Sequence, residues 1–286
     1  MERNPVGETA IISWASGHDF CRLPEFNVFL QSIRRCGFLG DVILFSHDLD
    51  AKMRHRFKSM GYDVIEVNPD RIHVVVRDRF LILYEWLVDH GWKYNNIIMT
   101  DSKDVLFQRD PVEYINKAAT ARKLTQPTWI TGDAYVMLCS EGEEHCRSSW
   151  NSINQVRLQQ NVAEFEQNFV HRPIINSGFI IGTPEELKNL SILLWTNSIR
   201  TLDSLSEQAT LNYLYFYLEK DARYELYTPQ DCPLCITGEG IKEGWLDSKP
   251  IFKDGQLYYP KSDEPFYVFH QWDRTEYRDA ILEQFV

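Results

Sequence analysis

Strand and helix patterns alternate through the first hundred residues of the chain. Short apolar runs rich in β-branched residues are separated by longer segments whose apolar residues recur at helical spacing and stop near a glycine. A strand that is repeatedly followed by a helix predicts a parallel sheet with right-handed crossover connections. We therefore expect an α/β fold with a mostly parallel central sheet flanked by helices. The predicted strands are residues 9–14, 41–45, 62–67 and 97–99, and the predicted helices are residues 24–36, 52–60 and 77–90.

The second part of the chain is less regular. The last third is rich in Gly, Pro and Tyr, and we find no internal repeat, no low-complexity tract and no linker. One domain with an irregular second half is the expected organisation. The predicted helices here are residues 112–121, 184–199 and 206–218, and the predicted strands are residues 128–139, 174–182 and 265–270.

Composition excludes several classes of protein. The formal net charge of −11 argues against a nucleic-acid binder, because such proteins contact phosphates through clustered Lys and Arg. No run of eighteen apolar residues appears and no apolar signal core follows Met1, so we expect a cytoplasmic protein without a transmembrane segment. Among the six cysteines only Cys232 and Cys235 have metal-ligand spacing, without a matching second pair, so reduced thiols are expected. Oligomeric state is left open.

Two carboxylates follow the predicted strand at residues 97–99. Asp101 and Asp104 come directly after this buried apolar run, which would deliver them to an edge of the sheet. Ligands of open α/β sheets bind beyond the carboxyl ends of the strands. Paired carboxylates suit Mg²⁺ or Mn²⁺, which prefer oxygen ligands and share them with substrate phosphates. The alternative is that both residues only form a turn or cap a helix.

Polar residues also interrupt or end two later apolar strands. Asn176, Ser177 and Gly178 lie within the predicted strand at residues 174–182, and His270 ends the predicted strand at residues 265–270. Glycine allows another group to approach the backbone closely, and an Asn side chain offers both a donor and an acceptor to a hydroxyl group. A histidine at the end of a buried strand is otherwise often only structural.

The order of these features resembles the nucleotide-sugar-dependent glycosyltransferases of the GT-A fold, a Rossmann-like fold. Their acidic metal motif, Asn-x-Gly strand, Asp-Gln helix start and C-terminal His appear in the same order here, and residues 100–111 (TDSKDVLFQRDP) are especially similar to one group of small transferases of this class. The resemblance extends from about residue 9 to residue 274. It implies a single catalytic domain, residues 1–286, with a nucleotide-binding half at about 9–110 and a sugar and acceptor half at about 111–286.

The resemblance implies a metal site. Asp101, Asp104 and His270 would hold Mn²⁺ or Mg²⁺, which stabilises charge on the leaving nucleoside diphosphate as a Lewis acid. The acidic motif is one residue longer than the Asp-x-Asp of the family, so which carboxylate binds the metal directly stays open. The Gly and Lys that follow the His in glycogenin-like relatives are absent, and Arg274 or Lys103 would supply the positive charge for the diphosphate.

Further site residues follow from the same resemblance. Trp14 would lie beside the base and ribose, and Arg77 or Arg79 would pair with phosphate, unless they form surface ion pairs with Asp78 or Glu85. The donor sugar would contact Asn176, Ser177 and Gly178. Glu207 and Gln208 stand where relatives have Asp-Gln near the anomeric carbon, although Glu207 also suits a helix N-terminus. An acceptor-side base, needed for inversion, would be Asp133 or Glu141, and stereochemistry stays open.

The implied function is metal-dependent transfer of a sugar, hexosyl or deoxyhexosyl, from a nucleotide-diphosphate donor to a hydroxyl of a carbohydrate or other glycoconjugate acceptor. A sugar-phosphate nucleotidyltransferase is the first alternative, but the glycine-rich basic loop expected after its first strand is not found in residues 15–20. A non-catalytic sugar-nucleotide-binding relative is the second, and the retained acids and His argue against it.

Overall fold

The computed structural model describes most of the chain. The described residues are 9–15, 17, 20–125, 134–141, 172–199, 206–218, 221, 223–246 and 248–285. Asp133 and the first half of the predicted strand at residues 128–139 lie outside them. Within these ranges no helix combines the length and the apolar composition that a membrane crossing requires.

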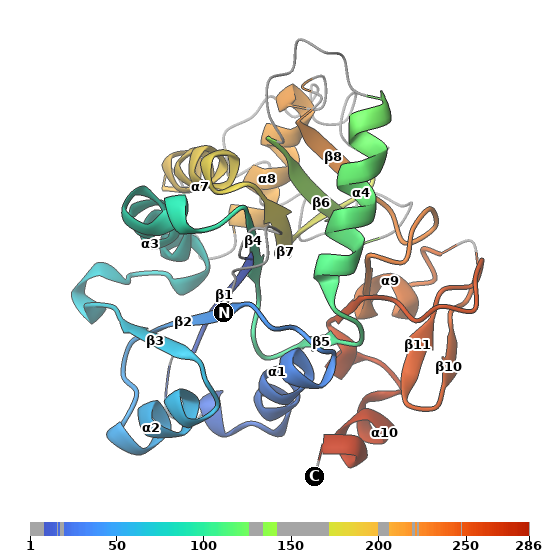
Figure 1. Cartoon of the computed structure of the whole chain (residues 1–286), viewed down its shortest axis with the longest axis horizontal. Coiled ribbons are helices and arrows are strands. Elements are labelled where there is room, and N and C mark those ends of the chain that lie inside the picture. Colours follow the sequence, from blue (N-terminus) through green and yellow to red (C-terminus); the bar gives the residue numbers. More distant parts are fainter. Residues whose placement is uncertain are drawn as a thin grey trace, which may run out of the picture.

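A seven-stranded sheet forms the centre of the molecule (Figure 1). The four strands predicted from the first hundred residues are parallel to one another. One strand, β7, runs antiparallel to both of its neighbours, and the last two strands are parallel. The predicted α/β fold with a mostly parallel sheet is therefore confirmed. In spatial order the strands are β3 (Asp63–Glu66), β2 (Asp41–Ser46), β1 (Thr9–Trp14), β4 (Asn96–Thr100), β7 (Ile175–Gly182), β6 (Val136–Ser140) and β8 (Tyr224–Tyr227).

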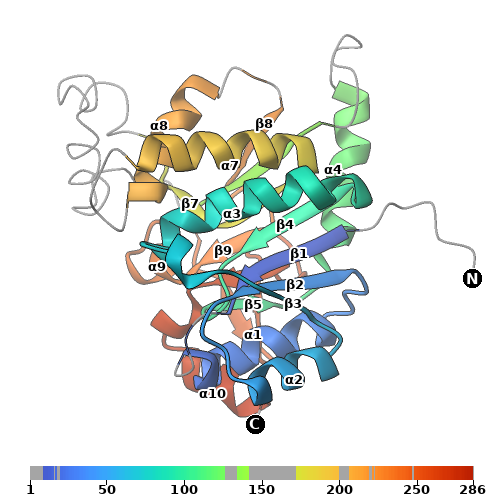
Figure 2. The ribbon, with the colours of Figure 1, turned by 90° about the vertical axis from the view of Figure 1, so that its left-hand side faces the viewer.

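Helices cover both faces of this sheet. Successive side chains of a strand point to opposite faces, so a strand whose side chains are all apolar needs a layer of helices on each face. On β1, Ile11 packs into a core with α1 (Pro24–Arg35), α2 (Ala51–Ser59) and α4 (Pro111–Thr125). Its neighbours Ala10 and Ile12 pack into a second core with helices of the other face. Figure 2 shows two of these, α3 and α7, side by side. The helices of this face are α3 (Val75–His90), α7 (Pro184–Ser198) and α8 (Ser206–Leu218).

Helix α3 begins two residues before the predicted start. The carboxylate of Asp78 accepts hydrogen bonds from the backbone N–H groups of His73 and Val74, both at 2.8 Å. These bonds satisfy two donors that precede the helix, and they allow it to start at Val75. The earlier start places Arg79 a full turn inside the helix.

The last third of the chain, for which the sequence predicts one strand at residues 265–270 and otherwise irregular structure, builds a second sheet with a segment from the first half. The three strands are β5 (Val105–Phe107), β12 (Val268–His270) and β9 (Cys235–Thr237), with β12 in the middle. A third core, which includes Val28, Leu106 and Phe269, joins this sheet to α1 and to α10 (Arg278–Leu282). The remaining elements are α9 (Gly238–Lys242), the hairpin β10 (Ile251–Lys253) and β11 (Gln256–Tyr258), and 3₁₀ turns at Phe20–Arg22, Pro69–Arg71, Gly91–Lys93, Trp272–Arg274 and Glu283–Phe285.

Candidate functional site

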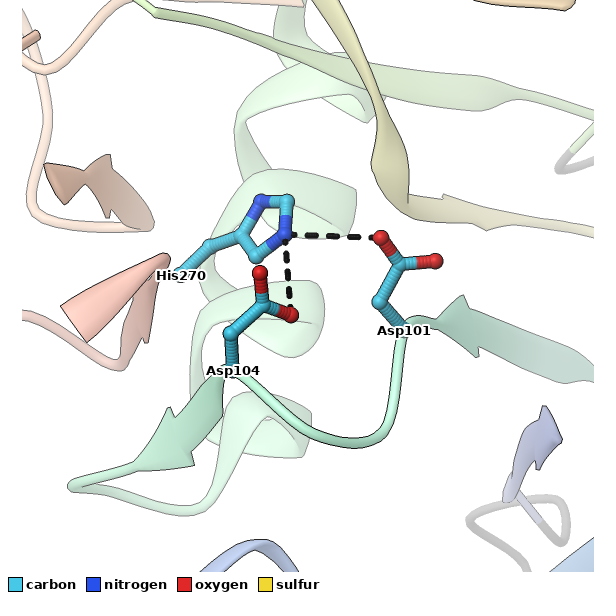
Figure 3. A group of neighbouring side chains, drawn as sticks. All are labelled: Asp101, Asp104 and His270. Carbon is cyan, nitrogen blue, oxygen red and sulfur yellow. Dashed lines mark ion pairs between the residues drawn. The ribbon is translucent and has the colours of Figure 1, made fainter. Parts of the chain in front are cut away.

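Residues 101–104 lead from the central sheet to the second sheet. Strand β4 ends at Thr100 and β5 begins at Val105, so Asp101 and Asp104 stand at the two ends of this short connection. In the second sheet His270 pairs with Val105, which places its side chain beside Asp104. The three side chains point toward one another (Figure 3), and their ligand atoms lie within 4.8 Å of one another.

His270 is buried between the two carboxylates. Its Nε2 lies 3.5 Å from Asp101 Oδ2 and 3.6 Å from Asp104 Oδ1. Neither ring nitrogen has a hydrogen-bond partner among the described residues. Burial lowers the pKa of His270, but Asp104 and Asp101 outweigh it and raise the pKa to about 10. Burial also opposes ionisation of Asp101, yet Arg79 and His270 hold the pKa of that carboxyl well below its usual range.

This cluster has the composition of a cation site. Two carboxylates and one imidazole form a mixed donor set that suits Mn²⁺, and Mg²⁺ would share the carboxylates. The spacing gives a second reason: His270 Nε2 faces the two carboxylates at 3.5 and 3.6 Å, too far for good hydrogen bonds, so the three ligand atoms face one another as the ligands of one ion would. The three residues therefore fit a divalent cation of this kind.

Arg79 supports the cluster from helix α3. One Nη of its guanidinium donates to Asp101 Oδ1, and Nη2 donates to the carbonyl of Ser177 at 3.2 Å. Its Nε is buried without a partner in the described structure. Arg77 is placed differently, because its guanidinium is bonded to Asp78 and it does not line the neighbouring cleft. Of the two arginines, only Arg79 reaches the predicted site.

A cleft of about 460 Å³ opens beside the acidic residues. Trp14, which packs against Phe45 with 5.4 Å between ring centroids, forms part of its wall. Lys103 lines the cleft but is paired with Asp273 at 3.0 Å. The lining residues are Trp14, Phe20, Val75, Val76, Arg79, Thr100, Asp101, Ser102, Lys103, Asp104 and Arg274.

Arg274 is the cation of this cleft with the weakest contacts to carboxylates. Its side chain is 48% exposed. Its Nη2 lies 3.7 Å from Asp104 Oδ2 and its Nη1 lies 3.6 Å from Glu239 Oε2, both longer than a good hydrogen bond. It can therefore reorient toward an anion in the cleft at little cost.

The predicted Asn-Ser-Gly stretch lies against the acidic cluster. Gly178 accepts a hydrogen bond from the backbone N–H of Asp101 at 2.8 Å. A Cβ at position 178 would lie 2.5 Å from both Asp101 Oδ2 and His270 Cε1. Only glycine fits there, because its backbone directly contacts two of the three cluster residues.

Two buried glutamates lie next to this stretch. Ser177 Oγ donates to Glu207 Oε1 at 3.5 Å, while Glu207 Oε2 is buried without a partner among the described residues. Burial raises the pKa of Glu207 to about 7, against the attraction of Arg79. Glu141 follows β6, and its Oε1 accepts hydrogen bonds from Asn176 and Gln208. Burial also raises the pKa of Glu141 despite the hydrogen bond from Asn176.

Comparisons with known proteins place this site in a known fold. No protein-family model matches the sequence, and no curated protein matches it. Among solved structures, the apo structure of the bifunctional glycosyltransferase WbbM matches with a TM-score of 0.55 and 10% identity over 99% of this chain. This chain covers 51% of that chain, about half of its length.

Two structures of LgtC match over almost the full length of both chains. An active-site mutant of LgtC gives a TM-score of 0.57 at 11% identity and covers 96% of this chain and 94% of its own. The galactosyltransferase LgtC in complex with donor and acceptor sugar analogs gives 0.55 at 12% identity, with coverage of 96% and 93%. This chain has the GT-A glycosyltransferase fold.

Within this GT-A fold the structure brings together most of the predicted residues. Asp101, Asp104, His270, Arg79 and the Asn176–Gly178 stretch meet at one place, and Trp14, Glu207, Gln208 and Glu141 lie around them. Sequence reasoning missed the cleft residues Phe20, Val75 and Val76. Their composition contains no signal of a ligand site, because apolar residues of this kind are more often core residues.

Proposed function

We propose that this chain is a metal-dependent glycosyltransferase that moves a hexosyl or deoxyhexosyl group from a nucleotide-diphosphate donor to a hydroxyl of a carbohydrate or glycoconjugate. The observation that carries the proposal is the convergence of Asp101, Asp104 and His270 beside a cleft of about 460 Å³. The GT-A fold supports it. A cation held by these residues, Mn²⁺ or Mg²⁺, would stabilise the charge that develops on the leaving diphosphate.

The cleft is suited to the nucleotide. Its volume is that of a site for a small ligand, and Trp14, Phe20 and the two valines at the start of α3 supply apolar walls for a base. All lining residues except Arg274 belong to residues 9–110. We therefore assign the nucleotide to this half and the sugar and acceptor to residues 111–286, within one catalytic domain.

Arg274 is our choice for the residue that contacts the diphosphate. Lys103 is engaged by Asp273, whereas Arg274 is half exposed and lies beside Asp104 at the cleft. A guanidinium can bind two phosphate oxygens at once through parallel N–H bonds. It would thus take the place of the Lys that glycogenin-like relatives carry after the corresponding His.

The donor sugar is assigned to the end of the cleft at Arg79, next to Gly178 and Glu207. Arg79 Nε and Glu207 Oε2 are buried polar atoms without partners in the described structure, and sugar hydroxyls would satisfy both. At neutral pH Glu207, with a pKa of about 7, can either donate or accept such a bond.

Binding of nucleoside diphosphates tests the proposal. Calorimetric titrations with UDP, GDP, CDP and dTDP, each with and without Mn²⁺, should show one diphosphate that binds only with the metal. The same diphosphate then identifies the donors to test for sugar transfer. Absence of binding to all four in the presence of Mn²⁺ would contradict the proposal, as would pyrophosphate release from a nucleoside triphosphate and a sugar phosphate.

A further inference from the structure

Strand β7 is irregular where it passes the acidic cluster. On the β6 side Leu138 pairs with Ile180, but the next residue, Cys139, pairs with Asn176. Ser177, Gly178 and Phe179 therefore have no partner on the described strand β6. This three-residue bulge frees backbone groups on the β6 side while β7 keeps its contact with Asp101 on the β4 side.

Side-chain amides satisfy two of the freed N–H groups. Gly178 N donates to Asn176 Oδ1 at 2.6 Å, and Ser177 N donates to Gln208 Oε1 at 3.4 Å. Both amides thus turn their oxygen toward the backbone of the bulge. A flipped amide would place its NH₂ group against a backbone N–H, leaving two donors without an acceptor.

Glu141 determines this orientation. Its Oε1 accepts from Asn176 Nδ2 at 2.7 Å and from Gln208 Nε2 at 3.3 Å, so one carboxylate oxygen receives the opposite end of both amides. Hydrogen bonds also fix the backbone of Glu141 at its N–H and at its carbonyl. The N–H donates to Ile174 O at 2.8 Å, and the carbonyl accepts from Thr237 Oγ1 at 3.3 Å.

We propose that Glu141 is a positioning residue rather than a catalytic base: it orients the Asn176 and Gln208 amides that hold the bulge, and the bulge holds Asp101 through Gly178. Both hydrogen bonds occupy Oε1, so this oxygen is committed to the two amides and is poorly suited to take a proton from an acceptor hydroxyl, and a substitution that removes the carboxylate tests Oε2. The inference rests on the proposed function only in taking Asp101, Asp104 and His270 as the cation site. It does not depend on which sugar is transferred.

Two substitutions of Glu141 separate the roles. E141Q keeps a carbonyl oxygen that can accept from both amides but cannot act as a base, whereas E141M has similar size and no acceptor. We expect E141M to speed backbone amide exchange across residues 175–180, measured without metal, and to weaken Mn²⁺ binding by about 10- to 100-fold. E141Q should stay close to wild type in both measurements and in sugar transfer.

The matched control is E186M. Glu186 has the same 5% exposure as Glu141, but it lies on α7 and pairs with Arg223, away from the bulge. E186M should leave exchange across residues 175–180 and Mn²⁺ affinity unchanged, whatever its effect on overall stability.

Wild-type exchange and Mn²⁺ affinity in E141M would overturn the proposal. So would loss of transfer in E141Q with exchange and Mn²⁺ affinity intact, because the carboxylate would then take part in the chemistry. If E141M does not fold, E141Q still decides whether the carboxylate acts as a base, and a loss of transfer in E141Q with exchange and Mn²⁺ affinity intact overturns the proposal. Exchange and Mn²⁺ affinity can be measured even if the chain transfers no sugar, so failure of the positioning role is distinguishable from failure of the proposed function.

Discussion

The two sides of Asp101 are organised in opposite ways. On one side stands the cation cluster, where neither nitrogen of His270 has a hydrogen-bond partner in the described part of the chain. On the other side stands the bulge, where the Asn176 and Gln208 amides each use both their oxygen and their nitrogen in hydrogen bonds. The contrast indicates that atoms left without partners are available to a ligand, while satisfied atoms keep the geometry fixed.

Substituting Asp104 tests the cation side with the largest expected effect. D104N keeps the shape of the side chain but removes one of the two negative charges that face His270. We expect loss of Mn²⁺ binding and a fall in transfer of about 1,000-fold, since a bound metal supplies several kcal/mol of charge stabilisation. Calorimetry and initial rates measure both, and D63N, at an exposed position of β3, is the control. Wild-type Mn²⁺ affinity in D104N would show that Asp104 is not a ligand of the cation.

Adding one methyl group to the bulge should damage the cation side. In G178A the new Cβ would lie 2.5 Å from Asp101 Oδ2 and His270 Cε1, so those side chains must move. We expect about 10- to 100-fold weaker Mn²⁺ binding and a loss of about 1–3 kcal/mol of stability. S177A loses only a 3.5 Å contact to Glu207 and is the control for metal affinity. Equal Mn²⁺ affinities in G178A and S177A would show that the bulge does not control the geometry of the cation cluster.

Glu207 should make stability depend on pH. Its pKa of about 7 exceeds the ordinary 4.5, so the folded state binds the proton more tightly and stability falls as pH rises through this window. E207Q removes the free-energy cost of ionising this buried carboxyl. We expect E207Q to be about 2–3 kcal/mol more stable than wild type at pH 8.5 and no more stable near pH 4. Denaturant unfolding at both pH values tests this, and a difference that does not change with pH would contradict it.

Arg274 should give the smallest effect. The Arg274 side chain is half exposed and its contacts to Asp104 and Glu239 are long. R274A should therefore leave the melting temperature nearly unchanged. The KM for the donor should rise about fivefold, which corresponds to about 1 kcal/mol of lost charge interaction. K103A is the comparison, since Lys103 is held by Asp273. A larger rise of KM in K103A than in R274A would reverse our assignment of the diphosphate contact.

Local patterns predicted the regular half of the fold. The apolar runs and helical spacing from residue 9 to residue 99 indicated the parallel strands, because burial of one face follows directly from periodicity. The start of α3 was misplaced by two residues, because the bonds from Asp78 to the preceding backbone carry no signal in the periodicity. The second sheet was not predicted, since β5 and β12 are separated by more than 150 residues.

The sequence by itself determined that carboxylates and a histidine stand at the ends of buried strands, because polar residues that terminate an apolar run must lie at a sheet edge. That they meet was implied by the resemblance alone, and only the tertiary structure brings them together through contacts that no local pattern contains. The pairing of His270 with Val105 and the contact of Gly178 with Asp101 are long-range registers between strands. The hydrogen bonds from the Asn176 and Gln208 amides to Glu141 also join residues far apart in the sequence. Such registers depend on packing across the whole molecule, which no local pattern encodes.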